Sequence, residues 1–231
     1  MEAILLAGGL GTRLATRLKD IPKPMAPVAG RPFLEILLNE LSRNGCTRVL
    51  LSVGHLHAVI QNHFGAFFQG MKLDYVIESF PIGTGGAIRT ALAQAKNDTV
   101  LVLNGDTFLQ VDYVSLVKFH TAQSANLTIA VTRQTDIARY GGVVIEGKRI
   151  IGFKEKGLSG AGWINAGVYV LQKNLQWPRA LEERFSFEVD FLVPELDRLA
   201  PAAYKVEGVF LDIGVPEDLD RAQLELASFV Q

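Results

Sequence analysis

Cysteine is nearly absent from this 231-residue sequence, and histidine is scarce. The single cysteine, Cys46, cannot form an internal disulfide. It ends a predicted helix, away from any histidine and acid suited to activate a thiol, so we interpret it as structural. Among the four histidines only His55 and His57 form a close pair, and without a third ligand in view they argue against a zinc site.

The chain also lacks a long apolar run and an excess of charge of either sign. No segment approaches the about 18 to 20 residues that cross a bilayer, and Met1 leads into a strand-like run without a basic flank and cleavage site. Lysine and arginine (23) nearly balance aspartate and glutamate (24), which gives no sign of a nucleic-acid or membrane partner. We therefore expect a cytoplasmic protein that binds a small ligand.

Apolar residues are abundant, and in the first half they form alternating strand and helix patterns. A hydrophobic content of 48% suffices for a sizeable core. The short runs rich in Val, Ile and Leu that predict buried strands are 3–7, 48–53, 73–77 and 100–103. Helical spacing predicts helices at 33–41, stopped by Asn44-Gly45, and at 87–95. The alternation predicts an α/β fold with a mainly parallel sheet and helices on both faces.

The second half has a different pattern, with more β-like runs separated by glycines and charges. These runs are 127–131, 142–145, 150–153 and 163–171. No clear long helix is predicted before 188–199, and a last helix is predicted to begin near Pro216, with Glu217 and Asp218 in its first turn. We expect a mixed sheet here and, since no linker is visible, one domain over residues 1–231.

The stretch LLAGGLGTRL (5–14) places a glycine-rich turn between a strand and a helix, which is a generic phosphate site. It does not match the P-loop, because Gly11 is followed by Thr12 and Arg13. It does not match the dinucleotide fingerprint either, because Leu14 stands where the third glycine belongs. We therefore interpret the stretch as a loop whose backbone N–H groups and Arg13 can bind phosphate. Lys23 follows it in a stiff, proline-rich stretch.

Two aspartates follow apolar strands, Asp106 in LNGDT (103–107) and Asp212 in FLDIG (210–214). An acid in such a place is ordinarily a cap, just as a lone Arg13 or Lys23 is ordinarily a solvated charge. The carboxyl edge of an open α/β sheet is nevertheless where ligands bind. If the fold brings the two carboxylates together, they are suitable ligands for one Mg²⁺ that carries a nucleotide's phosphates.

Seven stretches together resemble the sugar-1-phosphate nucleotidylyltransferases, also called nucleoside-diphosphate-sugar pyrophosphorylases. They are LLAGGLGTRL, PKPM, GTGGAI (83–88), LNGDT, FKEK (153–156), INAGVY (164–169) and FLDIGVPEDL (210–219). The resemblance runs from about residue 2 to residue 225. It implies a Rossmann-like three-layer α/β sandwich with a mixed, mainly parallel sheet, the nucleotide-diphospho-sugar transferase fold. It also implies a nucleotide-binding part at about 1–110 and a sugar-phosphate-binding part at about 111–231.

The resemblance assigns roles to individual positions. Those implied to bind the nucleotide are Leu6, Ala7, Gly8, Gly9, Gly11, Thr12, Arg13, Lys23 and, against the base, Gly85. Those implied to bind the sugar phosphate are Gly142, Glu155, Lys156 and Asn165. Asp106 and Asp212 are implied to hold Mg²⁺, and with Arg13 and Lys23 they form the implied catalytic set.

The implied reaction is transfer of a nucleotide from a nucleoside triphosphate to a sugar 1-phosphate, with release of pyrophosphate. GTGGAI, FSFEVDFL (185–192) and FLDIGVPEDLDRAQ (210–223) look most like the D-glycero-α-D-manno-heptose 1-phosphate guanylyltransferases, which make GDP-heptose for surface polysaccharides. FSFEVDFL is first interpreted as an amphipathic entry into a core helix, with its phenylalanines inside and Glu188 within reach of a sugar. Mannose-1-phosphate guanylyltransferases and N-acetylmuramate-1-phosphate uridylyltransferases are the near alternatives.

Two readings from other classes are a metal-dependent glycosyltransferase and an inactive regulatory homologue. A glycosyltransferase would want Asp-x-Asp where Asn104-Gly105-Asp106 stands. An inactive homologue would be expected to have lost one of the four catalytic positions, and all four are present. Both readings are therefore less favoured than a nucleotidyltransferase.

Overall fold

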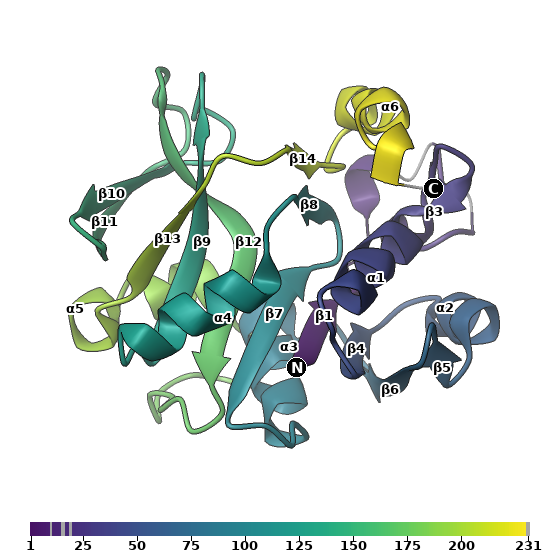
Figure 1. Ribbon diagram of the computed structural model, residues 1–231, viewed down its shortest axis with the longest axis horizontal. Helices are drawn as coiled ribbons and strands as arrows, with labels where there is room; N and C mark the ends of the chain where they lie inside the picture. The colour runs from purple at the N-terminus through teal and green to yellow at the C-terminus, as the bar shows by residue number, and fades with distance from the viewer. Residues whose placement is uncertain (10, 15–16, 19, 230–231) are drawn as a thin grey trace.

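One ten-stranded sheet runs through the computed structural model, which describes residues 1–9, 11–14, 17–18 and 20–229 (Figure 1). In spatial order its strands are β10 (Gly142–Glu146), β11 (Arg149–Lys154), β13 (Ala202–Val206), β9 (Leu127–Gln134), β12 (Gly162–Gln172), β7 (Thr99–Asn104), β1 (Glu2–Leu6), β4 (Arg48–Val53), β6 (Met71–Ile77) and β5 (Phe67–Phe68). Leu10, inside the predicted glycine loop, lies outside the described residues. No helix among the described residues is both long and apolar enough to cross a membrane.

Helices cover both faces of the sheet. The α-helices are α1 (Phe33–Arg43), α2 (His57–Phe64), α3 (Gly83–Ala93), α4 (Tyr113–Ala122), α5 (Leu196–Leu199) and α6 (Pro216–Glu225). The shorter turns are η1 (Thr12–Leu14), η2 (Lys23–Met25), η3 (Phe187–Leu192) and η4 (Ala227–Phe229). In Figure 1, α1 and α4 lie in front of the sheet and α3 lies behind it.

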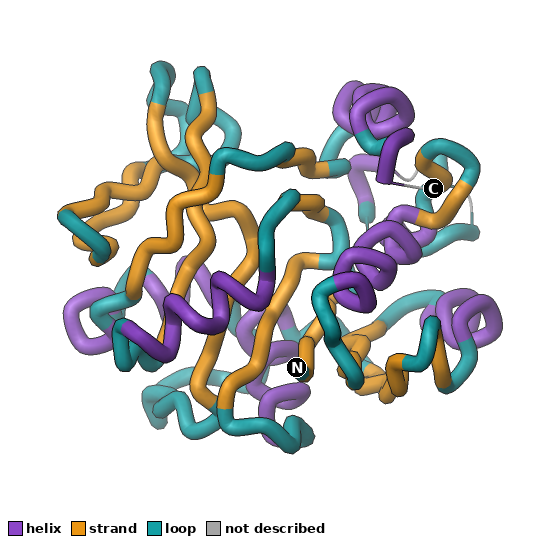
Figure 2. The backbone as a smooth tube through the Cα atoms, in the orientation of Figure 1, coloured by secondary structure: helices purple, strands orange, loops and turns teal. Residues whose placement is uncertain are grey.

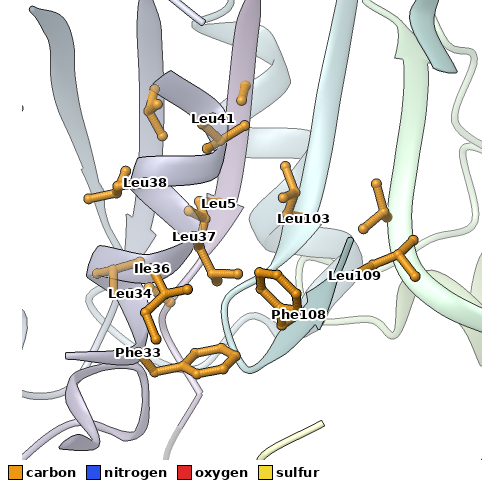
Figure 3. Close-up of a cluster of buried hydrophobic side chains, with 14 of the residues drawn as sticks. Leu5, Phe33, Leu34, Ile36, Leu37, Leu38, Leu41, Leu103, Phe108 and Leu109 are labelled. Atoms are coloured by element: carbon orange, nitrogen blue, oxygen red, sulfur yellow. The ribbon is translucent and has the colours of Figure 1, made fainter. Parts of the chain in front are cut away.

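The strands supply a core on each face because successive side chains point to opposite sides. Leu5 belongs to the cluster that contains α1, α2 and α4, whereas Ile4 belongs to the cluster that contains α3, η3 and α5. Figure 3 shows side chains of α1 facing Leu5, Leu103 and Phe108. Since both faces are buried, the central strands are continuous apolar runs, as the sequence predicted.

The pairing of the strands corrects one prediction about the sheet. β7, β1, β4 and β6 are parallel, as expected for the first half. Beyond β7, however, β12 pairs antiparallel with both β7 and β9, and β10 and β11 form an antiparallel hairpin. The description "mainly parallel" therefore fits the first half only, and the sheet as a whole is mixed.

The helix predictions were confirmed in the first half and partly wrong in the second. The predicted helix 188–199 is instead the π-helical turn η3 followed by the short α5, because Pro194 between them cannot donate a backbone hydrogen bond. The sequence reading also missed α4, whose N-cap Asp112 accepts from the N–H of Ser115. Cys46 is buried, as a structural residue should be.

Two short strands return the end of the chain to its first half. β8 (Thr107–Leu109) pairs antiparallel with β14 (Phe210–Asp212), and in Figure 2 both lie above β7 and β1, flanked by loops. A second small pair joins β2 (Pro27–Val28) and β3 (Arg31–Pro32). From α6, Gln223 accepts from the N–H of Ala29 at 2.9 Å. The chain after about residue 207 therefore packs against the first 110 residues. The part predicted to bind the nucleotide, about 1–110, is in contact with the last segment of the part predicted to bind the sugar phosphate.

Candidate active site

A cavity of about 420 Å³ opens where β1 and β7 end. Its lining includes Leu6, Gly8, Gly9, Gly11, Asn104, Gly105 and, from the first turn of α3, Gly83 and Thr84. A smaller cavity of about 290 Å³ shares Gly9, Gly11, Lys23 and Asp106 with it and adds Arg13 and Gly214. The predicted glycine loop therefore lies at the carboxyl edge of the parallel strands, where an α/β sheet binds its ligand.

Lys23 is held at a fixed point of this cavity. It begins the turn η2, with Pro22 before it and Pro24 after it, and its side chain is only 12% exposed. Its Nζ lies 2.6 Å from Oδ2 of Asp106. The glycine loop can lie this close to Lys23 only because residue 11 is a glycine. Its φ is +60°, and a Cβ there would lie 2.9 Å from Cβ of Lys23.

The fold brings Asp106 and Asp212 together from positions far apart in the chain. Asp212 lies opposite Thr107 in the β8–β14 pair, and the N–H of Ile213 donates to the carbonyl of Asp106 at 3.0 Å. Burial raises the pKa of Asp212, and the charge of Asp106 raises it further, while Lys23 and Arg139 oppose both effects. Two carboxylates beside a cavity fit Mg²⁺, which takes few protein ligands and completes its shell with water and phosphate.

This pair is small for an all-protein metal cage. Among the residues that the structure describes, no group of three or more His, Cys, Asp or Glu side chains gathers in a metal-binding arrangement. Mg²⁺ does not need one, because it is usually held by one or two carboxylates plus substrate phosphates. The donor set therefore suits a metal that is shared with a nucleotide.

The rest of the loop is divided between structural and cavity-lining positions. Arg13, in η1, is exposed and lines the smaller cavity, and Leu6 lines the larger one. Ala7 is buried, and its N–H donates to the carbonyl of Ser52 at 2.7 Å, which fixes the start of the loop. The side chain of Thr12 lies outside what the structure describes.

Gly85 faces the protein interior. A Cβ on it would lie 2.1 Å from Cε2 of Phe185, and its N–H donates to the carbonyl of that residue at 3.0 Å. Its neighbours Gly83 and Thr84 line the larger cavity in its place. Packing against Phe185 thus explains why position 85 is a glycine. Contact between this turn of α3 and a base stays a prediction.

Asn165, on β12, lines neither of the two cavities and is held by two side-chain hydrogen bonds. Its amide nitrogen donates to Oε1 of Glu188 at 2.7 Å and to the hydroxyl of Tyr169 at 2.8 Å. Past Asn165, β12 shifts register, and a Cβ on Gly167 would lie 2.6 Å from the amide nitrogen of Asn104. Because Asn104 lines the larger cavity, this part of β12 lies next to that cavity. As expected, Phe185, Phe187 and Phe191 are buried.

The remaining predicted sugar-side residues lie on the β10–β11 hairpin and just beyond it. Gly142 pairs with Lys154 in that hairpin, and a Cβ on it would lie 2.9 Å from Ile137. Glu155 and Lys156 follow β11 and are exposed. Lys156 passes close to Gly141, the neighbour of Gly142, so the FKEK stretch and the Gly141-Gly142 stretch lie together.

The sequence reading missed Glu78. This half-buried residue follows β6, lines the larger cavity and stands beside Gly8, where a Cβ would lie 2.6 Å from its Oε1. The hydroxyl of Ser52 donates to it at 2.9 Å, and burial raises its pKa. The signal was present, since Glu78 is an acid directly after a parallel strand, as Asp106 is.

It also missed Arg139, which lies in the loop between β9 and β10. Its guanidinium is 2.6 Å from Oδ2 of Asp218 and 3.8 Å from Oδ2 of Asp212. The ring of Tyr140 lies 5.2 Å from the same guanidinium. No sequence signal marks this arginine, because its carboxylate partners are about seventy residues further along the chain.

The family model for nucleotidyl transferases matches residues 2–228. The D-glycero-α-D-manno-heptose 1-phosphate guanylyltransferase of Aneurinibacillus thermoaerophilus is 40% identical over 230 residues, covering 100% of both chains. The enzyme of the same name from Campylobacter jejuni is 44% identical over 219 residues, covering 94% of this chain and 96% of its own. The crystal structure of HddC from Yersinia pseudotuberculosis is similar, with a TM-score of 0.85 and 36% identity over 96% of this chain and 97% of that one. A further crystal structure is of HddC complexed with GMP-PN; it has a TM-score of 0.83 and 35% identity over the same shares.

Proposed function

The chain belongs to the nucleotidyl transferase family and is a nucleotidyltransferase, and on that premise we propose that it is a sugar-1-phosphate guanylyltransferase. It transfers GMP from GTP to D-glycero-α-D-manno-heptose 1-phosphate, which yields GDP-heptose and pyrophosphate. Two relatives of that name support this choice of substrates, because each aligns over nearly the whole of both chains. The cytoplasm, which supplies nucleoside triphosphates, is the compartment we propose.

The observation that carries the reaction type is the meeting of Lys23, Asp106 and Asp212 beside the glycine loop. We assign Lys23 to the α-phosphate of GTP and the two carboxylates to Mg²⁺. Bound there, the metal supplies positive charge to the triphosphate. Lys23 adds a second charge at a fixed position, so the ground-state repulsion between two polyanions is offset before they react.

The chemistry needs positioning and charge more than it needs a reactive side chain. A phosphate oxygen of the sugar 1-phosphate attacks the α-phosphorus in line, its new P–O bond forms, and the bond to the pyrophosphate oxygen breaks. The backbone from Leu6 to Arg13 wraps the nucleotide, with Gly11, Thr12 and Arg13 on the β- and γ-phosphates of the leaving group. No covalent intermediate with the protein is required.

Glu78 supports guanine as the base. Guanine presents two adjacent donors, N1–H and the 2-amino group, and a carboxylate accepts both at once. Glu78 lies in the larger cavity, and its carboxylate keeps free lone pairs after accepting from Ser52. We propose that it reads these donors, while the backbone at Gly83 and Gly85 borders the plane of the base.

We assign the sugar phosphate to the neighbouring residues of β10–β12 and of the turn after β11. Lys156 binds its phosphate, Glu155 and Asn165 bind its hydroxyls, and Gly142 leaves room for the ring. The hydrogen bonds of Asn165 to Glu188 and Tyr169 support this role, since they hold the amide in one orientation. The close approach of Gly167 to Asn104, which lines the larger cavity, also supports this assignment.

A matrix of substrates tests the proposal, with released pyrophosphate as the readout. The triphosphates are GTP, ITP, ATP, UTP and CTP, and the acceptors are the 1-phosphates of the heptose, mannose and N-acetylmuramate. We expect kcat/KM to be highest for GTP with the heptose, and ITP, which lacks the 2-amino group, to be worse than GTP. Turnover that is highest with UTP, or with mannose 1-phosphate, would overturn the base or the sugar assignment respectively. No release with any pair would overturn the function.

A further inference from the structure

We propose that, before substrates bind, Lys23 and Arg139 each neutralise one of the two metal-binding carboxylates and thereby exclude a divalent cation until the triphosphate arrives. This inference rests on the proposed function, because it takes Asp106 and Asp212 as the metal pair. It adds a role for Arg139, a positioning residue that the reaction itself does not require.

Each carboxylate has its own cation. Nζ of Lys23 is 2.6 Å from Asp106, and the guanidinium of Arg139 is 3.8 Å from Asp212. A cation within ion-pair distance of each carboxylate therefore compensates the negative charge that would attract a bare divalent cation.

The two cations differ in what holds them. Lys23 is confined by its proline-flanked turn and is 12% exposed, whereas Arg139 is 45% exposed and has a second partner. That partner, Asp218, is 6% exposed and lies only 2.6 Å from the guanidinium. Arg139 can therefore release Asp212 while its pair with Asp218 keeps it at the site.

The triphosphate removes this block by charge. Its phosphates compete with Asp106 for Lys23, and they bring oxygen ligands that a bare metal ion lacks in this two-carboxylate site. Asp212 then exchanges Arg139 for the metal. Metal and nucleotide thus enter as one unit, which avoids holding a metal against two carboxylates in a site with no phosphate to share it.

Titration with Mn²⁺ in the absence of nucleotide tests this, since the electron paramagnetic resonance signal of free Mn²⁺ reports binding without any turnover. We expect Arg139→Gln to bind Mn²⁺ about tenfold more tightly than the unchanged protein, because a positive charge close to the site has been removed. Arg139→Lys keeps the charge and should restore the weaker binding. Lys23→Met tests the other carboxylate in the same way and should also tighten binding.

Arg221→Gln is the matched control. Arg221 also contacts Asp218, at 3.3 Å, but its other ion pair is with Glu225 and not with Asp212, so its removal should leave the affinity for Mn²⁺ unchanged. A non-hydrolysable GTP analogue should reduce the difference in Mn²⁺ affinity between Arg139→Gln and the unchanged protein.

Two outcomes overturn the inference, and they can be told apart. If Arg139→Gln, Lys23→Met and the unchanged protein bind Mn²⁺ with equal affinity, Lys23 and Arg139 do not exclude the metal. The proposed function would not be affected by that result. If Asp106→Asn and Asp212→Asn also leave all Mn²⁺ binding unchanged, the metal pair itself is wrong, and that part of the proposed function fails with it.

Discussion

The end of the site that we propose for the phosphates (the phosphate end) and the end that we propose for the sugar (the sugar end) are built from different backbone and are fixed to different degrees. At the phosphate end, loops leave parallel strands and the β8–β14 pair locks two distant segments together, so that Lys23 is nearly buried against Asp106. At the sugar end, Glu155 and Lys156 follow an antiparallel hairpin and are exposed. The end to which we assign the chemistry is preorganised, and the end to which we assign the choice of acceptor is exposed.

This difference leads us to expect unequal costs for substitutions at the two ends. Preorganised charges in a site that excludes water contribute most to a transition state, because they do not have to reorient during the reaction. An exposed lysine keeps its rotamer freedom until substrate binds, and ordering it offsets part of the gain. Losses should therefore be greatest at Asp106 and Asp212 and smaller at Lys156.

The largest effect is expected from removing the charge of one of the two carboxylates that we assign to the metal. Asp106→Asn and Asp212→Asn should each lower kcat by about 10² to 10³, in the range of other removed charge-stabilising groups, while the protein stays folded. Pyrophosphate release measures the rate, and circular dichroism measures the fold. Asp98→Asn, on the exposed turn before β7, is the control and should keep full activity. A normal rate in either site variant would contradict the metal assignment.

The next effect concerns stability and should leave the chemical step alone. His120 is buried in α4, and its Nε2 lies 2.9 Å from the amide nitrogen of Gln172. An amide nitrogen only donates, so Nε2 must be unprotonated, and Nδ1–H donates to Thr128. Burial lowers the pKa of His120 to about 4, from an ordinary value of 6.5.

Since the folded protein holds this histidine neutral, its contribution to stability is complete above pH 6.5 and is lost as the pH falls toward 4. The loss is about 3 kcal/mol in the free energy of unfolding. Urea unfolding between pH 7.5 and pH 4.5 measures it. His120→Gln should flatten this pH dependence, and an unchanged slope in that variant would show that another group titrates.

A substitution at Gly85 tests whether this glycine is needed for packing or for contact with the base. Gly85→Ala should destabilise the protein by about 1 to 3 kcal/mol, because the new Cβ overlaps the ring of Phe185. Phe185→Leu removes part of that overlap, so the double variant should be more stable than the sum of the single effects predicts. Additive effects in urea unfolding would indicate that Gly85 matters for some reason other than Phe185.

The smallest effect is expected at the open end. Lys156→Met should raise KM for the sugar 1-phosphate by about tenfold, as for the loss of one partly screened charge contact, and leave KM for GTP unchanged. Lys173→Met, at the opposite edge of the sheet, is the matched control. Equal rises in both Michaelis constants would show that the two ends are not separate.

The sequence allowed the first half to be predicted well because its signals are local. Buried parallel strands are apolar runs, and the helix 33–41 carries its own stop signal at Asn44-Gly45, so β1, β4, β7 and α1 were found nearly to the residue. The glycine loop and Lys23 were marked by their own chemistry. Residues such as Asp106 and Asp212 were paired by resemblance to a family.

What could not be predicted depends on long-range contacts. The apolar strand in FLDIG was predicted, but no local signal showed that this strand, β14, pairs with β8, about a hundred residues earlier. Arg139 is held near Asp212 by its ion pair with Asp218. A glycine is needed at position 85 because the ring of Phe185 leaves no room for a Cβ. The predicted helix 188–199 was wrong for a different reason, because its helical pattern contains Pro194, which separates η3 from α5.

The central claim is that one site joins a guanine nucleotide to a sugar 1-phosphate with loss of pyrophosphate. Phosphorus-31 NMR of the protein with Mg²⁺, GTP and D-glycero-α-D-manno-heptose 1-phosphate tests it most directly. We predict that one pyrophosphate and one GDP-heptose form for each GTP consumed, and that nothing forms without the sugar phosphate. Consumption of GTP to GDP and phosphate, or no consumption at all, would contradict the account.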